Sequence, residues 1–325
     1  MERKVYLDSA ATTYVTNEVL NEMMPCYNIF FGNPNSIHSF GREAQGIVDR
    51  ARDRIAKTIN AKSEEIYFTS GGTEADNWAI KGIAHAYANK GKHIITSQIE
   101  HPAVMESCRA LEKEGFEVTY LPVDKYGVVS LAALLHAIRK DTILISIMAV
   151  NNEVGTIQNI KAIGKTAREN GILFHTDAVQ AYGALKLDVE DMCIDLMSFS
   201  SHKIYGPKGI GALYIRKGVR IANLLDGGHQ ERSKRGGTSN VPAIAGFGKA
   251  AEINARDLMI NNQRMKSLRD YFIKQVTEKI PYVIVNGHPQ QKVNSIVSIS
   301  FELIEGEAIL LMLDFEGIAV STGSA

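Results

Sequence analysis

Residues 198–211 read SFSSHKIYGPKGIG, and this stretch ties a candidate site to the fold. A β-type run leads into two hydroxyls, a histidine and Lys203, and a loop rich in Gly and Pro then leads into a further strand. A lysine in this setting can form a Schiff base with an aldehyde while its neighbours hold a phosphate group. A lone lysine in a loop is more often a solvated surface charge, so this stretch alone leaves both interpretations open.

The chain around this stretch, from about residue 64 to residue 215, alternates short β-rich runs with amphipathic helical stretches. This alternation predicts an α/β fold with a large, mostly parallel seven-stranded sheet and helices on both faces. Residues 42–59 place apolar side chains at helical spacing and predict a helix that packs one face on the core. Strands are expected near residues 66–69, 93–97, 117–121, 142–148, 173–176, 196–198 and 212–215, with helices in the gaps.

The sequence pattern changes after residue 241 and predicts a second, smaller α/β domain. A long helical stretch is followed by β-type runs at 282–285 and 295–301, a helical run at 306–315 and a strand at 318–320. We place the large domain at residues 15–250 and the small domain at residues 1–14 and 251–325. Because the last strand runs into STGSA at 321–325, the small domain is expected to be incomplete at its C terminus, with an exposed sheet edge.

Composition limits the function classes. Lys and Arg number 36 and Asp and Glu also number 36, so no net field attracts nucleic acid or an anionic membrane, and neither is expected as a partner. The longest apolar stretch, 142–150, is too short to span a bilayer, and the N terminus lacks a signal-peptide pattern, so we expect a cytoplasmic protein. Cys26, Cys108 and Cys193 form no CxxC pair and are each expected to be buried small hydrophobes. The nine histidines show no HExxH or paired Cys/His spacing, so no metal site is predicted.

The turn at residues 69–77, TSGGTEADN, follows a predicted strand and opens a predicted helix. Backbone N–H groups around Gly72 and the hydroxyl of Thr73 can converge there on an anion such as a phosphate. The turn is neither a Walker P-loop nor a GxGxxG fingerprint, which argues against a nucleotide. An ordinary βα turn with Thr73 near the N-cap remains the alternative.

The segment at residues 174–180, FHTDAVQ, places Asp177 at the carboxyl end of an apolar strand. Open α/β sheets bind their ligands at this edge, and a carboxylate there needs a cationic partner. A protonated pyridine nitrogen is one such partner, and keeping it protonated makes the ring an electron sink. The alternative is that Asp177 only caps the next helix.

These three segments, in this order, resemble the cofactor site of fold-type I, class V aminotransferase relatives, and the sequence resembles most closely the pyridoxal-phosphate-dependent cysteine desulfurases of the NifS/IscS type. The resemblance covers essentially the whole chain. Two departures are mild: Ser9 stands where the family usually has Asn, and Gly72 where it often has Ala. Further motifs that carry the resemblance are YLDSAATT at 6–13, GNPNSIH at 32–38, EHPAV at 100–104, NNEVGT at 151–156 and RGGTSNV at 235–241.

The resemblance implies pyridoxal 5'-phosphate as the cofactor and assigns a catalytic role to three residues. Lys203 is the implied Schiff-base lysine, Asp177 pairs with the pyridine nitrogen, and His101 stacks on the ring. Thr238 is implied to reach the phosphate of the other subunit, because the family forms homodimers with sites at the interface. The remaining implied contacts are Asn152 and Gln180 with the ring hydroxyl or the bound amino acid, and Gly72, Thr73, Ser200 and His202 with the phosphate.

The implied reaction removes sulfur from L-cysteine, giving L-alanine and an enzyme persulfide that a sulfur-acceptor or iron–sulfur scaffold protein receives for cluster assembly or tRNA thiolation. One alternative is another class V aminotransferase or a selenocysteine lyase, against which the run up to Ser324 and Ala325 argues. A second alternative is a non-catalytic, truncated protein that binds pyridoxal phosphate.

The C-terminal loop carries the largest departure from the family. The family's loop reads Gly-Ser-Ala-Cys, whereas this sequence reads Gly323-Ser324-Ala325. The sulfur-accepting cysteine and an arginine for the substrate carboxylate would follow. A shortened chain, a trimmed loop, or a UGA codon after Ala325 read as stop or selenocysteine would each account for this. The 325-residue chain is therefore expected to bind cofactor but to release little or no sulfur.

Overall fold

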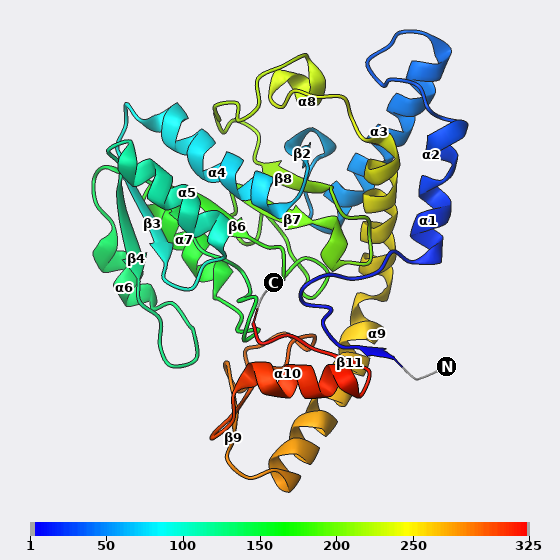
Figure 1. The fold of residues 1–325 in the computed structure, drawn as a ribbon. Coiled ribbons are helices and arrows are strands. Elements are labelled where there is room, and N and C mark those ends of the chain that lie inside the picture. The colour runs from blue at the N-terminus through cyan, green and yellow to red at the C-terminus, as the bar shows by residue number, and fades with distance from the viewer. Residues whose placement is uncertain (1–3, 324–325) are drawn as a thin grey trace.

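The computed structural model describes residues 4–323, so Ser324 and Ala325 lie outside the described residues. Its centre is a seven-stranded sheet in the order β2-β8-β7-β6-β5-β3-β4 (Figure 1). Strands β3 to β7 pair in parallel, and β8 runs antiparallel to both β2 and β7. The strands are β2 (Ile66–Thr69), β3 (His93–Ser97), β4 (Glu117–Leu121), β5 (Thr142–Ser146), β6 (Leu173–Asp177), β7 (Leu196–Ser200) and β8 (Gly211–Ile215).

The central strands are buried on both faces, as parallel sheets require. Neighbouring residues such as Leu196 and Met197 point into two different apolar clusters, one on each side of the sheet. Trp78 fills one cluster, and its indole Nε1 donates to the Ala222 carbonyl at 2.9 Å. The helices that flank the sheet are α3 (Ser39–Thr58), α4 (Gly72–Tyr87), α5 (Pro102–Lys113), α6 (Leu131–Ala137) and α7 (Ile160–Glu169). The predicted α/β fold and all seven strands are thus confirmed.

The helices expected in two of the gaps are absent from the part of the chain that the structure describes. Residues 178–195, between β6 and β7, form turns, and only the 3-10 helix η2 (Ser201–Lys203) lies between β7 and β8. Both gaps hold turn-forming residues, such as Gly183 with φ +89° and Gly209 with φ +77°, which end helices. The prediction of a buried Cys193 is also wrong: it is half-buried with φ +56°, because it forms the turn that precedes β7.

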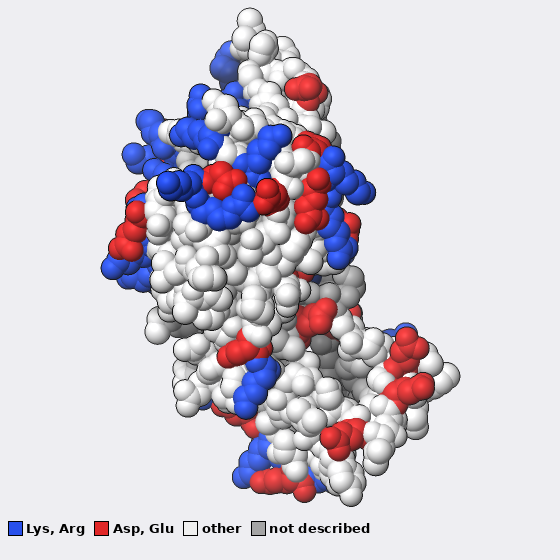
Figure 2. All heavy atoms as spheres, turned by 90° about the vertical axis from the view of Figure 1, so that its left-hand side faces the viewer, with Lys and Arg blue, Asp and Glu red and all other residues white. Residues whose placement is uncertain are grey.

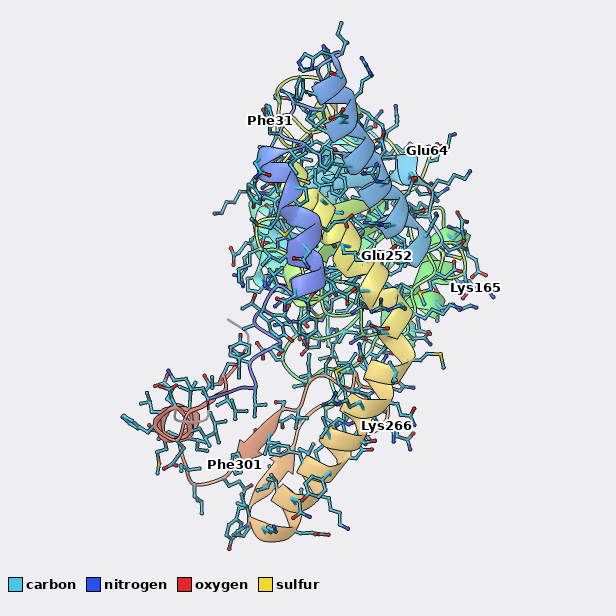
Figure 3. The ribbon with its side chains drawn as sticks, turned by 90° about the vertical axis from the view of Figure 1, so that its right-hand side faces the viewer. Phe31, Glu64, Lys165, Glu252, Lys266 and Phe301 are labelled. Atoms are coloured by element: carbon cyan, nitrogen blue, oxygen red, sulfur yellow. The ribbon has the colours of Figure 1, made fainter. Side chains whose placement is uncertain are left out.

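The long helix α9 (Val241–Lys279) joins the upper and lower parts of the molecule (Figures 1 and 3). Its buried residues all lie in the first third, against α1 (Asn17–Met23) and α3, whereas Lys266 lies in the lower part. The lower part holds β9 (Val283–Val285) antiparallel to β10 (Ile299–Phe301), then α10 (Gly306–Phe315). The N-terminal β1 (Val5–Tyr6) pairs in parallel with β11 (Ile318–Ala319).

This lower part matches the expected element types, but its strands are shorter than predicted. Residues 295–298 are outside β10, so the expected run at 295–301 is a strand only from Ile299. Helix α9 runs unbroken past residue 250, and the domain boundaries stay a prediction. The remaining short elements are α2 (Pro25–Asn28), η1 (Ser63–Glu65) and α8 (Gln230–Ser233).

The surface carries charges of both signs. On the face drawn in Figure 2, Lys and Arg side chains gather near the top among Asp and Glu side chains. Ion pairs also form on the surface: the exposed Arg139 pairs with both Glu117 and Asp141. Within residues 4–323, no helix combines the length and the apolar character needed to cross a membrane.

The crossing of α3 and α9 depends on Gly248. A Cβ at Gly248 would lie 2.6 Å from the Ala51 Cα, so the two helices must move apart. Gly248→Ala should lower the free energy of unfolding by about 1–3 kcal/mol, measured by denaturant titration. The matched control is Gly46→Ala on α3, where a Cβ meets only the Arg50 guanidinium at 3.6 Å. Equal effects of the two substitutions would contradict this packing.

Candidate active site

A cavity of about 420 Å³ opens at the carboxyl edge of the sheet, where β2 and β7 end. The structure brings four residues expected to bind phosphate together on its wall, from two segments more than 100 residues apart. They are Gly72 and Thr73 at the start of α4, and Ser200 and His202 at the end of β7 and in η2. Thr12, Ser70, Lys208 and Gly209 add to the lining.

The start of α4 is suited to an anion. Gly71 is the N-cap and no side chain caps the helix; Thr73 lies two residues further on and lines the cavity. Free N–H groups at a helix start favour negative charge. A Cβ at Gly72 would lie 2.7 Å from the Val179 Cγ2, which explains why a side chain is disfavoured there. Burial, with Lys203 and Lys208 nearby, lowers the pKa of His202 to about 4, so its ring is neutral.

Lys203 is half-buried, not a solvated surface charge. Its Nζ donates to the carbonyl of Ala10 and, at 2.8 Å, to that of Ala11. Burial lowers the pKa of Lys203, against the opposing charges of Asp177 and Asp8. A lysine with a lowered pKa is more often a free amine near neutral pH, which is the form that attacks a carbonyl.

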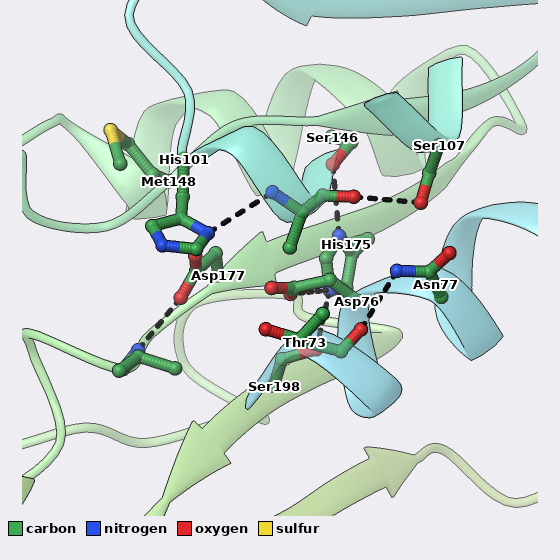
Figure 4. Close-up of polar contacts among 12 residues, drawn as sticks. Thr73, Asp76, Asn77, His101, Ser107, Ser146, Met148, His175, Asp177 and Ser198 are labelled. Atoms are coloured by element: carbon green, nitrogen blue, oxygen red, sulfur yellow. Dashed lines mark hydrogen bonds and ion pairs between the residues drawn. The ribbon is translucent and has the colours of Figure 1, made fainter. Parts of the chain in front are cut away.

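Asp177 ends β6, and the structure brings it close to His101, the residue before α5 (Figure 4). Its Oδ1 accepts from the Val179 N–H at 2.9 Å, so it shapes a turn and caps no α-helix. Burial raises the pKa of Asp177, while the Val179 N–H, His101 and Lys203 lower it. The His101 Nδ1 accepts from the Ala103 N–H at 3.1 Å, which leaves a proton for Nε2 in the neutral ring.

Six predicted site residues are not part of this cavity wall: His101, Asp177 and Lys203, described above, and Asn152, Gln180 and Thr238. Gln180 Nε2 donates to the Ala10 carbonyl at 3.0 Å, the same carbonyl that accepts from Lys203. Asn152 is half-buried in the loop after β5. Thr238 is exposed in the loop before α9, and Arg235 anchors this loop to Glu74 on α4 at 2.8 Å.

Three buried groups beside this site were not predicted: Asp76 and His175, both labelled in Figure 4, and Glu100. His175 contacts the Ser146 hydroxyl at 2.9 Å and the Ser198 hydroxyl at 3.0 Å, and burial lowers its pKa to about 3. Periodicity offered a signal for two of them. Asp76 follows Thr73 by three residues on a helix, and His175 precedes Asp177 by two on a strand, so each shares a face with a predicted residue.

Glu100 is a buried carboxyl that directly precedes His101. It accepts from the Ser97 hydroxyl at 2.6 Å and from the Met148 N–H at 3.0 Å. Burial raises its pKa to about 8, so it is mostly protonated at neutral pH.

None of the three cysteines lines this cavity. Cys26 is buried on α2, and Cys108 is buried on α5 with its pKa raised by burial to about 12. Cys193 precedes the amino end of β7, the opposite edge of the sheet.

Comparison with known proteins gives a consistent family. Residues 5–325 match the family described as Aminotransferase class-V. The cysteine desulfurase IscS of Dictyoglomus turgidum is 54% identical over 325 residues, which span 100% of this chain and 82% of that protein. A solved NifS-like protein is 40% identical with a TM-score of 0.96, over 98% of this chain and 87% of the other. A structure described as SspA in complex with cysteine is 39% identical with a TM-score of 0.87, over 99% and 90%.

Glu100 should make stability depend on pH. Between its ordinary pKa of 4.5 and about 8, the folded chain holds a proton there that the unfolded chain has lost. The free energy of unfolding therefore falls as pH rises through this window, by up to about 1.4 kcal/mol per pH unit from this group. Glu100→Gln cannot ionise, so its urea-unfolding stability should fall less over the same window.

The control for this measurement is Glu106→Gln, because Glu106 is an exposed carboxyl on α5 that pairs with Arg109. This control should follow the wild-type pH profile. Parallel profiles for Glu100→Gln and wild type would contradict a protonated Glu100.

Proposed function

The chain belongs to the aminotransferase class V family, among the cysteine desulfurases of the NifS/IscS type, and on this premise we propose that it removes sulfur from L-cysteine with pyridoxal phosphate as cofactor. The products are L-alanine and a persulfide. One observation carries the proposal: Lys203, Asp177 and the open start of α4 meet at one edge of the sheet.

The residues present fit this cofactor. The N–H groups at the start of α4, the hydroxyls of Thr73 and Ser200, and the ring of His202 would hold the phosphate. Gly72 lets the start of α4 lie close to Val179, since a side chain there would press on Val179. The Asp177 carboxylate would pair with the ring nitrogen, and the Lys203 amine would bind the aldehyde. When bound, the cofactor supplies an electron sink for the substrate's α-carbon.

Asp177 and His101 would hold the ring. An ionised Asp177 keeps the ring nitrogen protonated by direct attraction, and this attraction is strong because Asp177 is buried. The Ala103 N–H fixes the orientation of the His101 ring against the cofactor.

Lys203 would bind the cofactor and move protons. Its lowered pKa favours the neutral amine, which can accept a proton as a general base. The Ala10 and Ala11 carbonyls hold Nζ in place, and Gln180 fixes the same N-terminal segment through Ala10. The segment thus orients the amine and can receive it again after each proton transfer.

L-cysteine as substrate is supported by the family and by the similar SspA structure, which is described as a complex with cysteine. The sulfur acceptor must be an ionised thiol that reaches the cavity. Cys26 and Cys108 are buried and Cys193 lies at the opposite edge, so we assign the role to none of them. A sulfur-acceptor or iron–sulfur scaffold protein would then receive the sulfur. Unpaired cysteines suit a reducing compartment, and we propose the cytoplasm.

We also propose a homodimer. Several large apolar side chains stand exposed near the N terminus, with Phe31 63% and Ile37 91% exposed, which is typical of an interface. Tyr14, Met24 and Tyr27 belong to the same exposed set. The loop that holds the exposed Thr238 is anchored by the ion pair of Arg235 with Glu74, next to the residues that would bind this chain's own phosphate. From there Thr238 would reach the phosphate of the partner subunit.

The test is to reduce the cofactor-loaded protein with borohydride and map the pyridoxyl group by peptide mass spectrometry. The label should lie on Lys203, and Lys203→Ala should lose essentially all of it. Lys208→Ala is the matched control, because Lys208 is the lysine that lines the cavity wall, and this variant should leave the label on Lys203. A label that persists in Lys203→Ala, or that maps to Lys208, would show the assignment to be wrong.

A further inference from the structure

A second buried carboxyl, Asp76, lies beside the group assigned to the ring nitrogen. Asp76 is on α4, one turn after Thr73, and is 1% exposed, while Asp177 is 6% exposed. One carboxylate oxygen of each and one ring nitrogen of His101 all lie within 4.8 Å of one another. The Oδ1 atom of Asp76 has no hydrogen-bond partner. Its nearest basic atom is the Nε2 of His175, at 3.6 Å.

Two carboxylates this close in a buried site cannot both ionise without a large cost. The surrounding groups decide which one keeps the proton. Asp177 has the Val179 N–H, with Lys203 and His101 nearby, and all three favour its charge. Burial and the nearby carboxyls of Asp177 and Glu100 disfavour the charged form of Asp76, and only the Ser198 hydroxyl favours it.

Among the described residues, only the Ser198 hydroxyl favours the charge of Asp76, and His101, within 4.8 Å of it, acts on Asp177. The ring of His175, from β6, is buried between the hydroxyls of Ser146 and Ser198 and is neutral near pH 7. Glu100, from the loop before α5, is mostly protonated there. Lys203, from η2, acts on Asp177 and bonds to Ala10 and Ala11.

We propose that Asp76 is a positioning residue that holds the proton of this carboxyl pair, so that Asp177 alone is ionised where the ring nitrogen binds. The inference rests on the proposed function, because it assigns a task to the neighbour of Asp177. A proton on Oδ1 would also let that unpartnered atom donate a hydrogen bond. A shift of roughly half an ångström would bring it to hydrogen-bond distance of the His175 Nε2. The Nδ1–H of His175 would then donate to Ser146.

The direct test is infrared spectroscopy of the protein at neutral pH, with and without pyridoxal phosphate. Protonated carboxyl groups absorb at a different infrared frequency from carboxylates. Asp76→Asn should remove a protonated-carboxyl band in both states, and Glu100→Gln should remove a different one, which assigns the second protonated group. In Asp177→Asn the Asp76 band should titrate away at lower pH, because the repelling charge is gone. Loss of a carboxylate band in Asp76→Asn would overturn the proposal.

A second measurement uses the charge of the variant. Asn matches a protonated Asp in shape and charge. Asp76→Asn should therefore bind pyridoxal phosphate within about threefold of the wild-type affinity, which is less than the tenfold change that corresponds to one pKa unit. A change of about tenfold or more would mean that a negative charge had been removed, and would contradict the proposal.

The two proposals fail separately. If borohydride places the cofactor on Lys203 but the infrared spectrum shows an ionised Asp76, the function stands and this inference falls. If the cofactor is not on Lys203, the cofactor-free spectra still decide where the proton lies.

Discussion

The parallel pairing of β6 with β7 is the constraint on which the site depends. Its register sets His175 opposite Leu196 and Asp177 opposite Ser198. Asp177 therefore ends one strand beside the strand that runs through Ser200 into Lys203. A slip of one residue would turn Asp177 to the other face of the sheet and separate it from Asp76, which reaches the same place from α4. The two apolar clusters that bury the central strands on both faces hold this register.

Burial is the second determinant, because it drives the groups around the site toward their neutral forms. The pKa of Lys203 is lowered, that of His202 is lowered to about 4, and that of Glu100 is raised to about 8. A cationic group bound in this site would pair with the Asp177 carboxylate. Holding these groups in a buried place costs stability, as functional sites commonly do. The cost is offset by packing elsewhere, such as the closely crossed α3 and α9 helices.

Much of this could be predicted from the sequence, for identifiable reasons. Alternating apolar runs predicted all seven strands, and the Gly72–Thr73 turn, Asp177 and Lys203 follow strand ends that the sheet brings to one edge. The hydrogen bonds of Lys203 to the Ala10 and Ala11 carbonyls could not be predicted, because they join a side chain to backbone carbonyls more than 190 residues away in the sequence. Glu100 was quoted only as part of a motif, since its burial depends on how its loop packs against Met148. The alternative that makes Asp177 a helix cap was wrong, because turns follow β6, whereas Thr73 does lie near the N-cap of α4, two residues after Gly71.

The most direct measurement is a crystal structure of the protein soaked with pyridoxal phosphate. The account predicts electron density continuous with the Nζ of Lys203, the phosphate at the start of α4 beside Thr73, and the ring nitrogen at the Asp177 carboxylate. Cofactor density joined to Lys208, or a ring nitrogen turned away from Asp177, would contradict it.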